Sequence, residues 1–357
     1  MDGLRWTLVV LVAAALLVVV DRLVARWEPR ERRRPERPPG GSGTAAFGEV
    51  VELFQPNARF LHEERERQRQ DLVQPGDADP MWIDLDSGSV AVGGRRSRLE
   101  LIAPGVWTTV AHRWRTRTTV VVDHDRCLVV DPALTPQDLD ALASDLHARG
   151  WRPVAGFTTH AHWDHLLWSA VLGDVPRWAT AETVAQVATH RSRLLREADD
   201  EVPGHDHAVV GRLTTLPTAP ADTPVEVPWG GPRAVVIPYA GHCPGSAALL
   251  LPDAGVLLAG DVLSDVEIPL LDRDAADPMG DYVRTLDVLE AAVARWDVPV
   301  VVPGHGAPCD RAGLAERLRA DRAYLAALST GGDVDDPRLE DPEQVVEHTA
   351  QVRLVGR

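Results

Sequence analysis

His160-Ala161-His162-Trp163-Asp164-His165 is the most informative stretch of this sequence. It directly follows an apolar run, residues 154–159, which is typical of a short buried β-strand. On an extended chain alternate side chains point to the same side, so His160 and His162 can hold one metal ion together. Asp164 and His165 follow where the chain is expected to turn into a helix. The pattern therefore predicts that these two residues reach a second ion nearby.

Four ligands do not complete two metal sites, and three further candidates each follow an apolar run. They are His242 in Ala-Gly-His-Cys-Pro-Gly-Ser (residues 240–246), Asp261 in a Gly-Asp pair, and His305 in Pro-Gly-His-Gly (residues 303–306). Small residues beside each candidate let the backbone approach a crowded site. Alone, each histidine would more often be a buried core residue and the aspartate a turn residue. Together with the cluster, they are predicted ligands.

Other residues of similar chemistry are not expected to bind metal. Cys243 follows His242 directly, so on an extended chain it points away from the site. Trp163 is predicted to pack beneath the site rather than to contact substrate. His205 and His207 repeat the His-x-His spacing, but they lie in an acidic, loop-like stretch without further partners.

The segments around these motifs alternate between strand and helix patterns. Short apolar runs predict strands over residues 106–110, 118–123, 127–130, 154–159, 234–239, 247–251, 256–259 and 298–302, and the first three of these are rich in β-branched residues. Helices are predicted over residues 136–149, 281–296 and 312–327. Interleaved strands and helices indicate a layered α/β body that begins near Leu99.

These motifs resemble those of the metallo-β-lactamase superfamily, in particular its hydrolase branch, which includes glyoxalase II. The hexapeptide at 160–165 and the strings around His242, Asp261 and His305 occur in the family's order. The resemblance covers roughly residues 99–328. It implies a four-layer αββα sandwich with the site at one edge of the two sheets.

The resemblance also implies a role for each ligand. One metal ion would be bound by His160, His162 and His242, the other by Asp164, His165 and His305, and Asp261 would bridge the two. Asp131 matches an early aspartate motif of the family, although Pro132 follows it where glycine or threonine is usual.

The expected activity is that of a metal-dependent hydrolase. Two divalent ions lower the pKa of a water between them, and the bridging hydroxide would cleave a small ester, thioester or lactone. Asp261, which joins the ions, and Asp164, which orients the nucleophile through its second oxygen, are the predicted catalytic residues. Zinc suits these ligands, and iron and manganese accept the same set.

Two functions of other classes stay open at this stage. A mononuclear-iron sulfur dioxygenase shares the fold, and a membrane-tethered binding protein would use the metal only for structure. The complete ligand set argues against a structural site, which needs no open coordination position. Among hydrolases, glutathione thioesters are disfavoured because only a short segment follows the last predicted helix. A β-lactamase is disfavoured because its substrates act outside the cytoplasm.

The composition excludes several other mechanisms. The net charge is −16, from 53 acidic and 37 basic residues, so an acidic surface disfavours nucleic acid as a partner. The sequence contains no lysine, which removes Schiff-base, phosphate-loop lysine and Ser-Lys chemistry. Three cysteines are too few for a disulfide framework. A small-molecule substrate is the expected partner, and the sequence predicts no oligomeric state.

The amino terminus predicts a membrane anchor. Residues 6–20 are apolar except for Thr7, and an extension to residues 4–24 gives a length that crosses a bilayer. A cleaved signal peptide is the alternative, but no small-residue cleavage site follows the run. Seven arginines within residues 22–37 place the following domain in the cytoplasm by the positive-inside rule.

The predicted organisation has four parts. Residues 1–27 form a transmembrane anchor, residues 28–80 a linker with a charged helical segment, and residues 81–330 the hydrolase domain. Residues 331–357 are predicted to be a flexible tail.

Overall fold

The computed structural model describes residues 82–84, 89–91, 99–220, 223–331 and 334–356. The predicted anchor and linker, residues 1–80, lie outside the described residues, so both stay predictions. Within the described part, no helix is long and apolar enough to cross a membrane. The described elements belong to one compact unit, Ala78–Arg357, in which β1 (Trp82–Asp84) pairs antiparallel with β2 (Ser89–Ala91).

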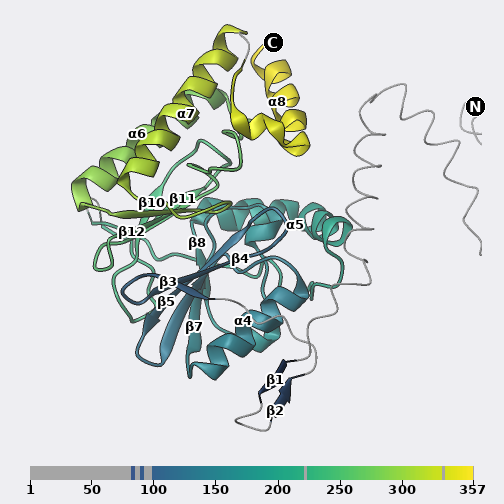
Figure 1. Cartoon of the computed structure of the whole chain (residues 1–357), viewed down its shortest axis with the longest axis vertical. Coiled ribbons are helices and arrows are strands. Elements are labelled where there is room, and N and C mark those ends of the chain that lie inside the picture. Colours follow the sequence, from purple (N-terminus) through teal and green to yellow (C-terminus); the bar gives the residue numbers. More distant parts are fainter. Residues whose placement is uncertain (1–81, 85–88, 92–98, 221–222, 332–333, 357) are drawn as a thin grey trace, which may run out of the picture. The chain divides into compact units, whose positions relative to one another are not determined.

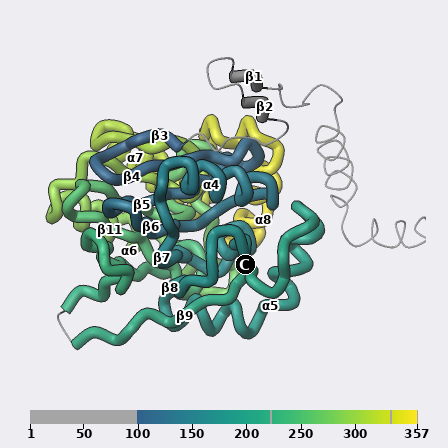
Figure 2. Tube along the Cα trace, turned by 90° about the horizontal axis from the view of Figure 1, so that it is seen from below, coloured from purple at the N-terminus to yellow at the C-terminus, as the bar shows by residue number. Residues whose placement is uncertain are grey.

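The larger sheet has seven strands that follow one another in chain order (Figure 2). They are β3 (Glu100–Ala103), β4 (Val106–Val110), β5 (Arg117–Asp123), β6 (Arg126–Val130), β7 (Arg152–Phe157), β8 (Arg177–Ala179) and β9 (Thr214–Thr215). Strands β3 to β6 are antiparallel, whereas β6 to β9 are parallel. Parallel neighbours need crossover connections, and two of these contain helices α4 (Pro136–Ala148) and α5 (Ala181–Glu201).

The smaller sheet has four strands, also in chain order. They are β10 (Val235–Pro238), β11 (Ala247–Leu251), β12 (Val256–Gly260) and β13 (Val300–Pro303). The first three are antiparallel, while β13 lies parallel to β12. Helix α6 (Pro278–Trp296) makes that parallel connection, and α7 (Arg311–Thr330) follows β13.

Side chains that alternate along the strands separate the layers. In β6, Leu128 and Val130 pack between the two sheets, while Val129 packs with α4 and α5. In β12, Leu258 belongs to the core between the sheets, and Leu257 packs with α6 and α7. Each sheet thus has helices on its outer face (Figure 1). This is the four-layer αββα arrangement that the resemblance implied.

The predicted strands and helices are all present, with small shifts at their ends. The tail prediction, residues 331–357, is wrong for the described part. Residues after α7 form a 3-10 turn, η3 (Pro337–Glu340), and helix α8 (Pro342–Val355), which lies beside α7 (Figure 1). The residues that α8 buries are glutamines, Gln344 and Gln351, so it has no strong apolar stripe to reveal it.

Candidate metal centre

The candidate ligands lie in loops that follow strand ends. The segment after β7 carries the hexapeptide, whose last three residues, Trp163–His165, form a 3-10 turn, η1. His242, Asp261 and His305 follow β10, β12 and β13. The strand ends of both sheets therefore bring all of the predicted ligands to one place.

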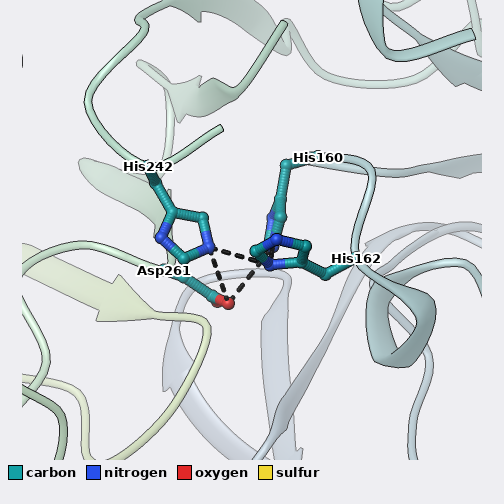
Figure 3. A group of neighbouring side chains, drawn as sticks. All are labelled: His160, His162, His242 and Asp261. Carbon is teal, nitrogen blue, oxygen red and sulfur yellow. Dashed lines mark hydrogen bonds and ion pairs between the residues drawn. The ribbon is translucent and has the colours of Figure 1, made fainter. Parts of the chain in front are cut away.

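Three histidines and an aspartate form the first donor set (Figure 3). The Nδ1 of His162 lies 3.1 Å from His160 Nε2 and 2.9 Å from His242 Nε2. Asp261 Oδ2 lies 3.2 Å from His160 Nε2 and 3.5 Å from His242 Nε2. His160, His242 and Asp261 are buried, whereas His162 is half-buried.

A second donor set lies beside the first. Asp164 Oδ2 is 3.4 Å from His165 Nε2 and 3.2 Å from His305 Nε2, and these two nitrogens are 3.3 Å apart. Asp261 joins this set as well, because its Oδ1 lies 3.1 Å from His165 Nε2 and its Oδ2 lies 3.4 Å from His305 Nε2. Its carboxylate therefore lies between the two sets.

The chemistry of these atoms fits divalent cations. Imidazole nitrogens and carboxylate oxygens are the ligands that zinc, iron and manganese accept. Asp261 Oδ1 is buried and accepts no hydrogen bond, although it points into the cluster. A buried carboxylate oxygen without a hydrogen bond is costly unless a cation satisfies it.

Four of the histidines face an oxygen on the far side of the ring. Such a contact holds the proton on Nδ1 and leaves the Nε2 lone pair for a metal. The pairs are His160 with Thr159 Oγ1 (2.9 Å), His165 with Asp131 Oδ2 (3.0 Å), His242 with the Leu270 carbonyl (3.2 Å) and His305 with the Trp114 carbonyl (2.9 Å). His162 differs, since it presents Nδ1 to the site.

Asp131 orients two of these histidines. Its Oδ1 accepts a hydrogen bond from the Thr159 amide at 2.9 Å, and its Oδ2 accepts one from the Thr159 hydroxyl at 2.6 Å. The hydroxyl oxygen is then free to accept from His160 Nδ1, while Asp131 contacts His165 directly. The aspartate has a left-handed backbone, with φ of 46°. It keeps this role although Pro132 follows it.

Protonation differs between the two sets. Burial, followed by His160, lowers the pKa of His242 to about 4, and burial together with His242 and His160 also lowers the pKa of His162. Burial opposes charge at His165 as well, but Asp261 and Asp164 raise its pKa well above the usual range. His162 and His242 are therefore already neutral, as histidine ligands must be, whereas His165 and His305 hold protons that a metal would displace.

The pKa values of the two carboxylates, Asp164 and Asp261, are lowered by the neighbouring histidines. Burial alone would raise the pKa of Asp164, but His165 and His305 lower it well below its usual range. The pKa of Asp261 is lowered in the same way, against burial, by His165, His160 and His305. Both carboxylates are therefore ionised and available as ligands.

Sequence reasoning missed Glu267. Its Oε1 lies 3.6 Å from His305 Nδ1, and burial raises its pKa to about 7. Together with Asp261 and His305, it forms a further group of donor atoms. The only signal is an acidic residue shortly after Asp261, and acidic residues are common in loops.

The residues that were not expected to bind metal lie outside the donor sets of the described residues. Cys243 is buried, with its sulfur 3.4 Å from Ser246 Oγ. His207 pairs with Asp199 at 2.9 Å on an exposed surface. Trp163 is buried and packs edge-on against Trp114, with ring centroids 5.4 Å apart.

Known proteins resemble this chain in sequence or in fold. A curated relative, the probable metallo-hydrolase YqgX of Bacillus subtilis (strain 168), is 24% identical over 202 residues, which is 53% of this chain and 84% of the relative. A metallo-beta-lactamase family protein from Thermus thermophilus has a TM-score of 0.50 and 21% identity over 72% of this chain and 95% of its own. A beta-lactamase domain protein from Burkholderia ambifaria has a TM-score of 0.51 and 17% identity over 74% and 89% of the two chains. At these identities, the solved structures show a common fold alone.

Two family models match the sequence itself. Residues 53–92 match a family of unknown function, DUF6191. Residues 112–330 match the model described as the metallo-beta-lactamase superfamily, and this range contains both donor sets and more than half of the chain. The protein therefore belongs to the metallo-beta-lactamase superfamily.

Proposed function

We propose that this protein is a hydrolase that uses two divalent metal ions to cleave a small ester, thioester or lactone. The observation that carries the proposal is the position of Asp261. Its Oδ1 lies 3.1 Å from His165 of the second set and its Oδ2 lies 3.2 Å from His160 of the first, so one carboxylate reaches both sets, which suits a pair of ions better than a single one.

The two donor sets indicate which residues would hold each ion. His160, His162 and His242 would hold one ion, Asp164, His165 and His305 the other, and Asp261 both. Two divalent ions in these positions would bring the pKa of a bound water close to neutrality and polarise the carbonyl of the substrate. Zinc is the expected metal, and iron or manganese fits the same donors.

Asp164 has a further task in this proposal. Its Oδ2 faces His165 and His305, so Oδ1 is the atom that would accept a hydrogen bond from the attacking water and orient it. The side chain is mostly buried, with 10% of its surface exposed, and His165 and His305 keep its pKa low. The carboxylate is therefore ionised when the water must be oriented.

Carbonyl substrates are favoured over nucleic acids on grounds of charge. The chain carries a net charge of −16 and no lysine, so it offers little attraction for a polyanion. We also propose that residues 1–27 anchor the domain to a membrane on its cytoplasmic face. Protease treatment of intact cells tests this arrangement, since it should leave the domain uncut.

Metal analysis and turnover on the full-length protein test the proposed activity. We expect two ions per chain and hydrolysis of at least one member of a panel of esters, thioesters and lactones, lost on chelation and restored by zinc. A phosphodiester serves as the control substrate. One iron per chain with oxygen consumption and no hydrolysis would instead establish a sulfur dioxygenase. Bound metal without turnover of any kind would favour a binding protein.

A further inference from the structure

The chain between Asp261 and α6 passes the metal centre without forming a helix or strand. Two of its residues contact ligands: the Leu270 carbonyl lies 3.2 Å from His242 Nδ1, and the Ser264 hydroxyl donates to the His305 carbonyl at 2.9 Å. Irregular backbone has no ladder partners, so its buried amides must find others. The position of His242 therefore depends on what holds this segment.

Helix α8 supplies the missing partners. Gln344 and Gln351 are seven residues apart, so they lie on the same face of the helix. Gln344 Oε1 accepts a hydrogen bond from the Ile268 amide, and Gln351 Oε1 accepts one from the Leu271 amide, both at 2.9 Å. Both glutamines are buried, Gln351 with 1% of its surface exposed. Helix α8 lies beyond residues 112–330, which match the superfamily model.

The Leu270 carbonyl and the Leu271 amide belong to one peptide group. That group is planar, and its C=O and N–H point in opposite directions. His242 therefore bonds to one edge of the peptide group, and Gln351 bonds to the opposite edge. If the plane rotates, both hydrogen bonds are lost. Hydrogen bonds connected in this way also strengthen one another.

We propose that Gln351 is a positioning residue of the metal centre, which holds the Leu270–Leu271 peptide so that its carbonyl orients His242. With Nδ1 bonded to that carbonyl, His242 turns Nε2 towards His162 Nδ1, 2.9 Å away. Gln351 is fixed in turn by Tyr324 of α7, to whose hydroxyl its Nε2 donates at 3.1 Å. The inference rests on the proposed metal centre but not on the substrate.

Gln344 provides a matched control. It makes the same kind of bond from the same helix, but to the Glu267–Ile268 peptide. The carbonyl of that peptide accepts from Arg338 at 2.9 Å instead of from a metal ligand. Glu267 contacts His305, but Arg338 still holds the Glu267 carbonyl and the Trp114 carbonyl still orients His305. A substitution at Gln344 should therefore loosen the segment without releasing His242.

The test measures zinc affinity of the full-length protein by competition with a chelator, with thermal unfolding and separate kcat and KM values alongside. Gln351→Leu removes the acceptor at similar volume and should weaken zinc binding by about 10-fold, the lower end of the loss for an outer partner of a ligand, because Gln351 acts on His242 through the Leu270 carbonyl. The kcat should fall more than KM changes. Gln351→Glu keeps the acceptor oxygen and should restore zinc affinity. Gln344→Leu should lower thermal stability but bind zinc like the unsubstituted protein.

Two results would overturn the inference: unchanged zinc affinity in Gln351→Leu, or an equal loss in Gln344→Leu. If Gln351→Leu does not fold, Gln351→Met, which has a similar shape and no oxygen acceptor for the Leu271 amide, takes its place in the same comparison. Zinc affinity is read without substrate. A protein that hydrolyses nothing, yet loses zinc in Gln351→Leu, would contradict the proposed function and still support the role of Gln351.

Discussion

Asp261 is the residue that both donor sets share, and its substitution is the most direct test of a two-metal centre. Asp261→Ala should lower hydrolysis by more than about 100-fold and reduce metal content, because even outer partners of metal ligands contribute 10- to 100-fold. His305→Ala should empty mainly the second position. Metal analysis and circular dichroism on the purified variants check both expectations.

Cys243→Ser and His205→Ala are the controls for this substitution, since neither residue belongs to a donor set of the described residues. Both should keep metal and activity. If Asp261 only ended a turn, its loss would cost about 1 kcal/mol of stability and little activity. A folded, active Asp261→Ala protein that retains its metal would contradict the two-metal assignment.

Gly304 gives a second test of the same carboxylate without removing it. A Cβ at this position would lie 2.0 Å from Asp261 Oδ1 and 3.0 Å from His165 Cε1. Gly304→Ala must therefore displace the shared carboxylate, and we expect loss of metal and activity in a folded protein. Gly150→Ala is the control: its added Cβ meets nothing within 4 Å, and only its φ of 72° strains the backbone. Unchanged metal content in Gly304→Ala would show that the carboxylate can move freely.

The ligands themselves could be predicted from the sequence, because each lies at the end of an apolar strand in a local pattern. The groups that contact the ligands from outside the donor sets could not be predicted. Asp131 was noticed as a motif, but its contacts with Thr159 and His165 join strands that are distant in sequence. The partner of His305 is the Trp114 carbonyl. Every residue has a backbone carbonyl, so the identity of residue 114 does not indicate this contact. Glu267 approaches His305 only because the loop after β12 folds back towards the site.

At the scale of elements, prediction succeeded where a segment buries apolar residues in a regular pattern. The strands on either side of the central core do so, and β11, predicted over residues 247–251, is found with the same bounds. Helix α5 buries only a few of its residues and is otherwise charged, so it was not predicted. Helix α8 is held by the amide groups of Gln344 and Gln351, which no hydrophobic pattern reveals.

Helix α4 owes its start to a capping box, which can be tested separately from the site. Thr135 Oγ1 accepts a hydrogen bond from the Asp138 amide, and Asp138 Oδ2 accepts one from the Thr135 amide, both at 3.0 Å. Thr135→Ala should lower the free energy of unfolding by about 1 kcal/mol and leave metal content unchanged. Ser144→Ala, an exposed change within the same helix, should cost less. Chemical denaturation compares the two, and equal costs would argue against the cap.

At the scale of the whole molecule, the metal centre joins the two halves of the sandwich. Each donor set combines residues that follow β7 of the larger sheet with residues that follow strands of the smaller sheet.

Metal that binds only the folded form stabilises it, by about 4 kcal/mol at a free concentration 1,000 times the Kd. Chelation should therefore lower the melting temperature, and zinc should restore it. If His160→Ala melts at the same temperature with and without the chelator, the effect depends on this centre. If the chelator does not change the melting temperature of the wild-type protein, the idea that metal links the two sheets is contradicted.

If the two donor sets hold one ion each, as proposed, acidification should remove the two ions in a fixed order. Carboxylates raise the pKa values of His165 and His305 against burial, led by Asp261 for His165 and by Glu267 for His305. Protons therefore compete with the second ion already near neutral pH, and its affinity falls as pH decreases through those raised values. In the first set, burial lowers the pKa of His162 and brings that of His242 to about 4, so protons compete for these two ligands only at lower pH.

Dialysis at a series of pH values from about 8 down to 5, across the usual range of histidine titration, followed by metal analysis, measures this order. The wild-type protein should pass through a state with one ion per chain. His305→Ala, which lacks a ligand of the second ion, should start from that state and hold its single ion to the same low pH as the wild type. Simultaneous loss of both ions would mean that the shared carboxylate of Asp261 couples the two sites more strongly than the histidine pKa values separate them.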